Sequence, residues 1–192
     1  MNLVAFVVAV IVGLLLAEAR VSWRHERALR ARGAVEPPGD VHWAMAVLYP
    51  GAFALMGLEG LYRAATLEAQ GAVSPAPPGP AWFVSGVVLF VASKALKYWA
   101  MRTLGGRWSF RVLLLPGAPL ITTGPYQYVR HPNYIAVVGE LVGAAMMVGA
   151  RVAGPVMIAL FGVALWARIR FEERAHESYP PAETRVRPSD GH

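Results

Sequence analysis

Five long apolar runs constrain the fold of this chain more than any other feature of its sequence. They cover residues 3–19, 42–62, 81–101, 134–149 and 152–166. Each run is close to the ~20 residues that a helix needs to cross the hydrocarbon core of a bilayer, or slightly shorter. A chain inside a membrane must satisfy its own backbone hydrogen bonds, and a helix does so within one segment. We therefore predict an all-α integral membrane protein with about five transmembrane helices.

The positions of the basic residues predict the orientation of these helices. Of the 18 Lys and Arg residues, 16 lie after the first run, between the later part of the third run and the fourth, or after the fifth. Arg63 and Arg151 are left for the opposite side. Since Lys and Arg collect on the cytoplasmic side, we expect the N-terminus outside and the C-terminus in the cytoplasm. Topology accounts for the net charge of +6, so we expect no nucleic-acid partner.

Several kinds of chemistry are excluded by the residue types present. The chain has no cysteine. Disulfides, thiolate zinc sites, iron–sulfur clusters and a cysteine nucleophile are therefore ruled out, and we expect no metal site. The glycine-rich fingerprint of soluble dinucleotide-binding folds does not occur either.

We expect a single membrane domain over residues 1–192. Residues 1–80 hold the first two runs and their linkers, residues 81–174 form the core, and residues 175–192 form a polar tail. Four prolines in the segment 70–80 predict a loop, because proline cannot continue a helix. Ala150 and Arg151 alone separate the last two runs, which predicts a tight C-terminal helical hairpin.

Polar and aromatic side chains gather directly before the fourth run. They are Tyr126, Tyr128, Arg130, His131 and Tyr134. A titratable group at a membrane boundary costs free energy unless it is solvated, paired or given a ligand, so this cluster is a candidate site. Pro132 predicts a helix start, where backbone N–H groups beside Arg130 would suit the carboxylate of a ligand. The alternative is an interfacial anchor.

Four carboxylates are further candidates for functional residues. Glu172 and Glu173 follow the fifth run, and a hairpin would bring them close to His131 at the start of the fourth. Glu140 and Glu59 lie inside apolar runs, where a carboxylate is costly and so is expected to face the bundle or a cavity. The alternatives are a salt-bridged helix end for the pair and interhelical hydrogen bonds for the two intramembrane residues.

Residues 102–123 are too apolar for a free loop and too broken to cross a membrane. We expect them to lie at the cytoplasmic interface, part extended and part turn, as a lid over the last three helices. The alternative is a loop that packs on lipid through Trp108, Phe110 and residues 113–115.

The string Gly-Pro-Tyr-x-Tyr-x-Arg-His-Pro-x-Tyr at residues 124–134, followed by a hairpin and then by Glu172 and Glu173, resembles the isoprenylcysteine carboxyl methyltransferase family and its phospholipid methyltransferase relatives. The resemblance covers about residues 94–174. It implies S-adenosylmethionine as the methyl donor, bound in a cytoplasmic cofactor pocket. The residues that it assigns to the cofactor are Tyr126, Tyr128, His131, Pro132, Tyr134, Glu172 and Glu173. Those that it points to for catalysis are Arg130, His131 and Glu140.

The resemblance also implies a lipophilic acceptor that enters from the surrounding membrane lipids. Methyl transfer to a carboxylate needs no base, whereas a phenol or enol would use one, for which His131 and Glu140 are the candidates. Arg130 would instead hold an anionic oxygen. The stretch Leu-Pro-Gly-Ala-Pro-Leu at residues 115–120 is similar to bacterial members, some of which methylate hydroxyls of long-chain polyketide lipids such as alkylpyrones and alkylresorcinols. A polyketide-type lipid hydroxyl or carboxylate is therefore the expected acceptor.

Three other functions stay open at the level of sequence. Phospholipid N-methylation uses the same donor with an amine acceptor. Sterol-reductase-like proteins carry a related His-Pro-x-Tyr string and bind NADPH, although they usually have more membrane spans. A non-catalytic scaffold or a small transporter would use the polar cluster only as an anchor and would bind no nucleotide.

Overall fold

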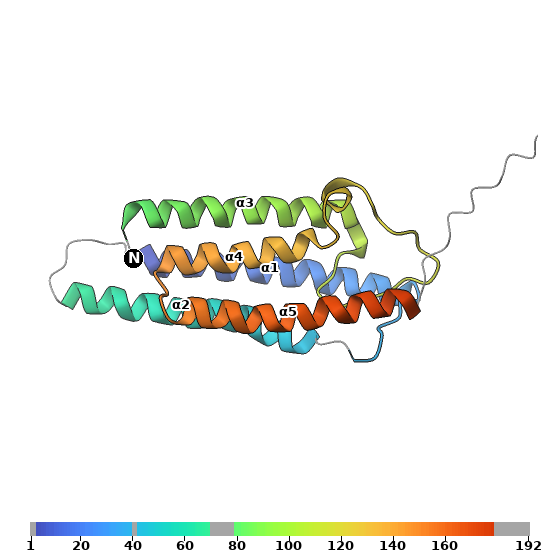
Figure 1. The fold of residues 1–192 in the computed structure, drawn as a ribbon, viewed down its shortest axis with the longest axis horizontal. Helices are drawn as coiled ribbons and strands as arrows, with labels where there is room; N and C mark the ends of the chain where they lie inside the picture. The colour runs from blue at the N-terminus through green and yellow to red at the C-terminus, as the bar shows by residue number, and fades with distance from the viewer. Residues whose placement is uncertain (1–2, 40–41, 70–78, 179–192) are drawn as a thin grey trace, which may run out of the picture.

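A computed structural model of the chain describes residues 3–39, 42–69 and 79–178 as a bundle of five α-helices (Figure 1). The helices are α1 (Leu3–Ala31), α2 (His42–Ala69), α3 (Pro80–Leu104), α4 (Pro132–Val148) and α5 (Ala153–Ser178). Two short 3₁₀ helices, η1 (Gly105–Arg107) and η2 (Gly124–Gln127), lie between α3 and α4. These described residues contain no β-strand, only one isolated bridge. The loop expected at residues 70–80 and the tail expected at 175–192 fall mostly outside the described residues.

Four of the helices are long and apolar enough to cross a membrane: α1, α2, α3 and α5. The fourth of the five predicted spans, α4, is not among them, because it has only 17 residues. At 1.5 Å per residue it is about 25 Å long, short of a hydrocarbon core of roughly 30 Å. Pro132 opens the helix, and Gly149, with φ of 69°, closes it in the left-handed conformation. The local start and stop signals therefore set a helix of almost the same length as the predicted run at residues 134–149, two residues earlier at its start and one at its end.

The short helix α4 lies inside the bundle and packs most extensively along α3. Glycines let the two backbones approach closely. A Cβ atom on Gly143 would lie 2.8 Å from the backbone nitrogen of Phe90 and 2.9 Å from the carbonyl oxygen of Gly86. Small residues allow the same close contact between helices in membranes, where van der Waals packing drives association.

The helices bury one side and expose apolar side chains on the other. The buried core joins residues from α1, α2, α3, α4 and α5 into one cluster. Large apolar side chains remain exposed on the outer faces, among them Leu16, Trp43 and Val88. An apolar outer surface of this kind is suited to contact with lipid rather than water.

The helices α4 and α5 are joined by residues 149–152 and run in opposite directions (Figure 1). The expected hairpin is present, but its second helix packs more extensively on α2 than on α4. Glu59 of α2 explains part of this arrangement, since its carboxylate accepts hydrogen bonds from the backbone N–H groups of Arg151 (2.8 Å) and Ala153 (2.7 Å). It thereby caps the N-terminus of α5, which is an interhelical role for this intramembrane carboxylate.

Candidate active site

The polar segment before α4 folds as a turn that delivers its side chains to one end of the bundle. The helix η2 spans four residues and α4 begins at Pro132, as predicted. His131 is the N-cap residue, and its carbonyl oxygen accepts hydrogen bonds from the backbone of Tyr134 (3.1 Å) and Ile135 (3.4 Å). Its imidazole makes no capping bond. The side chain is therefore available to the neighbouring residues.

Glu172 of α5 meets this helix start, as the hairpin predicted. The hydroxyl of Tyr134 donates a hydrogen bond to its carboxylate. His131 Nδ1 lies 3.6 Å from Glu172 Oε2, and the imidazole stacks on the ring of Tyr134 with 5.3 Å between ring centroids. The side chain of His131 is 29% exposed and that of Glu172 is 16% exposed. His131 and Glu172 are thus partly shielded from solvent and still accessible to a ligand from outside the protein.

Arg168 joins the same group from one turn earlier in α5. Its Nε donates to Glu172 Oε1 at 3.1 Å and to the hydroxyl of Tyr134 at 3.2 Å. The residue is only 4% exposed, although it carries a charge. A buried guanidinium that donates hydrogen bonds to a carboxylate fixes the direction of that carboxylate. We call His131, Tyr134, Arg168 and Glu172 the hairpin cluster.

The other residues predicted for the site lie around the hairpin cluster. Tyr126 is half-buried; burial raises the pKa of its hydroxyl, and the nearby Glu172 carboxylate raises it further, so the phenol stays protonated. Tyr128, Arg130 and Glu173 are exposed. The structure therefore separates the two adjacent carboxylates, with Glu172 inside the cluster and Glu173 on the surface.

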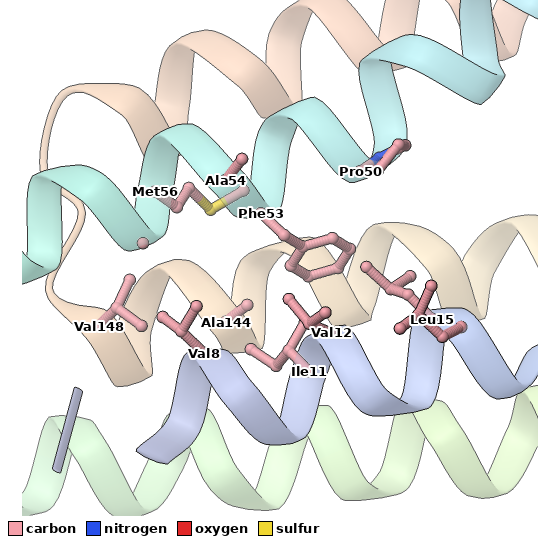
Figure 2. A pocket seen from close by; sticks show the side chains of 12 residues that line it. Val8, Ile11, Val12, Leu15, Pro50, Phe53, Ala54, Met56, Ala144 and Val148 are labelled. Carbon is pink, nitrogen blue, oxygen red and sulfur yellow. The ribbon is translucent and has the colours of Figure 1, made fainter. Parts of the chain in front are cut away.

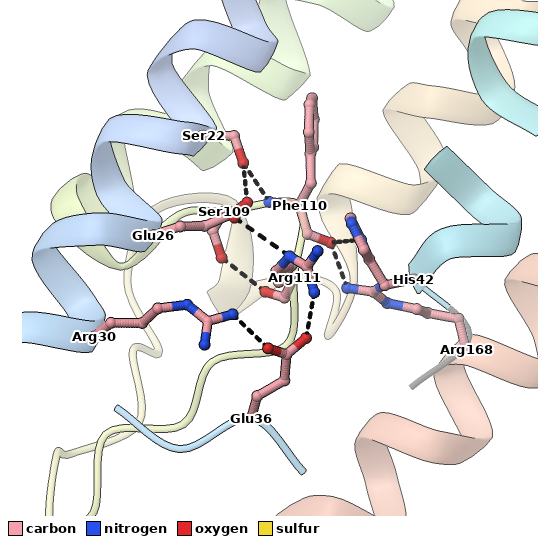
Figure 3. A network of polar contacts seen from close by, with 9 residues as sticks. All are labelled: Ser22, Glu26, Arg30, Glu36, His42, Ser109, Phe110, Arg111 and Arg168. Atoms are coloured by element: carbon pink, nitrogen blue, oxygen red, sulfur yellow. Dashed lines mark hydrogen bonds and ion pairs between the residues drawn. The ribbon is translucent and has the colours of Figure 1, made fainter. Parts of the chain in front are cut away.

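The segment between α3 and α4 is held by hydrogen bonds to three helices (Figure 3). Its centre is the backbone of Phe110, whose N–H donates to Ser22 Oγ of α1 at 2.8 Å. The carbonyl oxygen of Phe110 accepts hydrogen bonds from Arg168 Nη2 (2.7 Å) and from His42 Nδ1 of α2 (3.1 Å). Arg168 thus links this segment directly to the hairpin cluster.

A second contact ties the same segment to the linker after α1. Val35 and Leu114 form the isolated antiparallel bridge, with hydrogen bonds of 2.8 and 2.9 Å. Glu36 lies between Arg111 Nη1 at 2.6 Å and Arg30 Nη2 at 2.5 Å (Figure 3). Burial alone would raise the pKa of Glu36, but the two guanidinium groups more than offset it and lower the pKa below its ordinary value.

These contacts correct the alternative in which the segment packs on lipid through its aromatic residues. Trp108 is 2% exposed and packs edge-on against Phe110, with 5.2 Å between ring centroids. Its carbonyl oxygen accepts a hydrogen bond from His25 Nδ1 of α1 at 2.8 Å. The segment is therefore packed against the bundle, and its function as a lid stays a prediction.

Glu140 does not join the hairpin cluster. It is completely buried, and its Oε2 lies 3.0 Å from Lys94 Nζ and 3.4 Å from Lys97 Nζ, both on α3. The hydroxyl of Tyr49 from α2 donates to the same oxygen. Glu18 of α1 completes the group, since each of its two carboxylate oxygens lies 2.5 Å from one of the two lysines. We call Glu18, Tyr49, Lys94, Lys97 and Glu140 the interior cluster.

Sequence reasoning missed Arg168 as a site residue and missed the pairing inside the interior cluster. Arg168 was visible four residues before Glu172, at the spacing that places two side chains on one helix face. The partners of Lys94 and Lys97 had no such signal, because both lysines follow the same pattern as the basic residues at the membrane boundary. Two pockets in the described part of the chain lie away from the hairpin cluster, so the predicted cofactor pocket stays a prediction.

Comparison with known proteins finds two bacterial relatives and one similar family. Over 90% of its length, the chain is 28% identical to "Uncharacterized protein YpbQ" of Bacillus subtilis (strain 168), of which it covers 95%. It is 22% identical to an "Uncharacterized protein" of Haemophilus influenzae, over 81% of this chain and 84% of that one. No solved structure matches the chain.

Residues 86–178 match the model of the isoprenylcysteine carboxyl methyltransferase (ICMT) family. The matched range contains most of α3 and all of α4 and α5, and with them the whole hairpin cluster. The match suggests a membrane methyltransferase, and the four long apolar helices agree with an integral membrane protein. Through residues 86–178, just under half of its length, the chain is therefore similar to the isoprenylcysteine carboxyl methyltransferase family.

Proposed function

We propose that the protein is an S-adenosylmethionine-dependent methyltransferase that O-methylates a lipophilic acceptor in the membrane. One observation carries the proposal: the family-matched segment folds so that His131, Tyr134, Arg168 and Glu172 meet at one end of the bundle. The expected acceptor is a polyketide-type lipid with a hydroxyl or carboxylate group.

The residues at this end fit the chemistry of the donor. S-adenosylmethionine carries an ammonium, a sulfonium, ribose hydroxyls and a carboxylate. The Glu172 carboxylate and the rings of Tyr126 and Tyr134 would hold the cationic and hydroxyl groups. The first turn of α4, beside the exposed Arg130, would hold the carboxylate, since backbone N–H groups and the helix dipole favour an anion.

The remaining residues predicted to bind the cofactor belong to the same proposed site. Pro132 is buried and begins α4, so it sets the direction of the helix N-terminus. Tyr128 and Glu173 are exposed beside the hairpin cluster and would contact the outer part of the donor. The donor supplies an electrophilic methyl group when it is bound, so the protein chiefly has to align an acceptor oxygen and exclude water.

The need for a base depends on the acceptor. A carboxylate acceptor needs none, whereas a hydroxyl acceptor would lose a proton to a nearby group. His131 is the candidate base within the hairpin cluster, because its ring is partly exposed and lies next to Glu172. Arg130 would orient an anionic oxygen. Glu140 would act only if the acceptor reached the interior cluster.

We place the hairpin cluster on the cytoplasmic side of a bacterial inner membrane, with the N-terminus outside. Support comes from the basic residues, most of which lie at the same end of the helices as His131. The donor would then bind from the cytoplasm. The acceptor would arrive from the bilayer, whose lipids contact the apolar outer faces of the helices.

Binding of S-adenosylmethionine to the detergent-purified protein tests the proposal. We expect saturable binding by titration calorimetry, at least tenfold weaker in Glu172→Gln. Glu59→Gln is the matched control, since it makes the same change at the opposite end of the bundle. Absence of binding in lipid-supplemented samples would favour a scaffold or transporter, and binding of NADPH instead would favour a reductase. A product assay for O-methyl against N-methyl groups separates the proposal from phospholipid N-methylation.

A further inference from the structure

An apolar cavity of about 170 Å³ lies between α1, α2 and α4 (Figure 2). Side chains from the three helices point toward one another around it, among them Ile11, Phe53 and Ala144. Its wall also includes Leu16 and Ala54, which are exposed on the outside of the bundle. A dry apolar cavity of about 150 Å³ is large enough to take a benzene-sized group. This cavity can therefore hold part of an apolar molecule that comes from the lipid side.

The interior cluster does not line this cavity but lies about one helical turn from residues that do. Each of the three helices that form the wall carries a member of the cluster about one turn from a wall residue. The pairs are Leu15 and Glu18 on α1, Phe53 and Tyr49 on α2, and Ala144 and Glu140 on α4. In all three pairs the polar residue lies nearer the end of the bundle that holds the hairpin cluster, because α1 runs opposite to α2 and α4 (Figure 1).

One oxygen in the interior cluster has no partner among the residues that the structure describes. Glu140 Oε2 is close to Tyr49 and both lysines, whereas Oε1 is buried and accepts no hydrogen bond there. A buried carboxylate oxygen without a donor costs free energy, since it has lost its water. A hydroxyl group of a ligand would satisfy it.

We propose that the cavity and the interior cluster together form the binding site of the acceptor, which is an amphipathic lipid with a hydroxyl-bearing headgroup. Its apolar chain lies in the cavity, and its hydroxyl donates a hydrogen bond to Glu140 Oε1. The ammonium groups of Lys94 and Lys97 stabilise negative charge on the headgroup. This inference rests on the proposed function and assigns a binding site to its acceptor.

The order of the three features along α4 supports this assignment. Ala144 lines the cavity, Glu140 belongs to the interior cluster, and Tyr134 belongs to the hairpin cluster. At 1.5 Å per residue, Glu140 lies about 9 Å from Tyr134 along the helix axis. A headgroup at Glu140 would therefore lie between its own apolar chain and the proposed donor site.

The helices outside the family-matched segment gain a role from this arrangement. Residues 86–178 contain Lys94, Lys97 and Glu140, while α1 and α2 supply Glu18, Tyr49 and most of the cavity wall. The donor site would then be built by the matched segment, and the choice of acceptor would depend on α1 and α2.

Binding of 3-pentadecylphenol, compared with pentadecylbenzene, tests the site. We would count each probe bound to the purified full-length protein by native mass spectrometry. Wild-type protein should bind one phenol saturably and the hydrocarbon at least tenfold more weakly. Ala54→Phe fills the cavity wall and should weaken phenol binding at least tenfold, while Val88→Phe, the same enlargement on the exposed face of α3, should not.

The headgroup contact is tested by the double variant Lys97→Met with Glu140→Met. It removes one charge of each sign and leaves the pair of Lys94 and Glu18, so the bundle stays neutral at this point. We expect the preference for the phenol over the hydrocarbon to disappear. Equal binding of the two probes to wild-type protein, or unchanged phenol binding in Ala54→Phe, would overturn the inference.

Titration of S-adenosylmethionine in the same samples separates the two proposals. If Ala54→Phe binds the donor normally and loses the phenol, both proposals are supported. If wild-type protein binds the donor and ignores the phenol, the acceptor site is wrong and the methyltransferase proposal stands. If wild-type protein binds the phenol as expected and no donor, the methyltransferase proposal is wrong and the cavity is a lipid site of another kind.

Discussion

The hairpin cluster and the interior cluster use similar residues in different surroundings. In the hairpin cluster, the side chains of His131 and Glu172 keep 29% and 16% of their surface exposed. In the interior cluster, Lys97 and Glu140 keep 1% and 0% exposed. The first comes from a turn and two neighbouring helix ends, whereas the second needs four separate helices.

This difference separates donor binding, at the hairpin cluster, from the stability of the bundle, which depends on the interior cluster. Partly exposed charges can exchange their protein partners for a ligand at low cost, because water solvates them in the meantime. Fully buried charges cannot, so any one of them that loses its partner destabilises the whole bundle. We therefore expect substitutions in the interior cluster to act first on stability and those in the hairpin cluster to act first on donor binding.

The largest effect is expected from Lys97→Met alone. It leaves Glu18 and Glu140 with only Lys94 to balance them, and breaking a buried ion pair costs about 3–5 kcal/mol. We expect a Tm about 10 °C lower in thermal denaturation of the detergent-purified protein. The double variant Lys97→Met with Glu140→Met should recover most of this loss. A double variant less stable than the single one would contradict the charge-balance argument.

Glu172→Gln comes next, with its main effect on the donor. A hydrogen bond to a charged group is worth about 1.5–3 kcal/mol, which corresponds to roughly tenfold to hundredfold in Kd. Calorimetry should show this loss for S-adenosylmethionine with little change in Tm. The exposed neighbour Glu173 should show a smaller loss when changed to Gln. A larger loss of affinity in Glu173→Gln than in Glu172→Gln would place the donor on the outer side of α5 and contradict the assignment of Glu172 to the donor.

A moderate effect is expected from Arg168→Lys. Lysine keeps the charge but cannot reach Phe110, Tyr134 and Glu172 at once, because it lacks the planar fork of arginine. We expect donor affinity to fall several-fold and residues 108–120 to become easier to cleave in limited proteolysis. Arg170→Lys, on an exposed side of the same helix, is the control. Unchanged cleavage would show that the segment is held mainly by its contacts with α1 and α2.

The smallest effect concerns pH and Glu36. Its pKa is lowered from an ordinary value of 4.5, so its ion pairs stabilise the folded protein above that value. The stabilisation is lost as pH falls below 4.5 through the folded-state pKa. We expect a slightly lower Tm for Glu36→Gln than for wild type at pH 7, with the difference closing as the pH falls below 4.5 through the folded-state pKa. A difference that persists in acid would show that the contact does not depend on charge.

Much of the helical frame follows from local patterns. The apolar runs predicted all five helices, and Pro132 marked the start of α4 because proline fits the first turn of a helix. The proximity of Glu172 to His131 followed from a short connection between two runs. Such features depend on residues that are neighbours in the chain or on one turn, so one sequence is enough to predict them.

The tertiary structure decided which charges meet and which do not. Lys94 and Lys97 looked like residues of a basic membrane boundary, yet they pair with Glu18, which is 76 and 79 positions away. Similarly, the choice between Glu172 and Glu173 depended on which side of α5 faces α4. The sequence by itself determined the helices and the chemistry available at their ends, because periodicity and start signals act locally. Packing alone determined the partners inside the bundle, since burial forces each charge to find its counterion wherever the helices bring one.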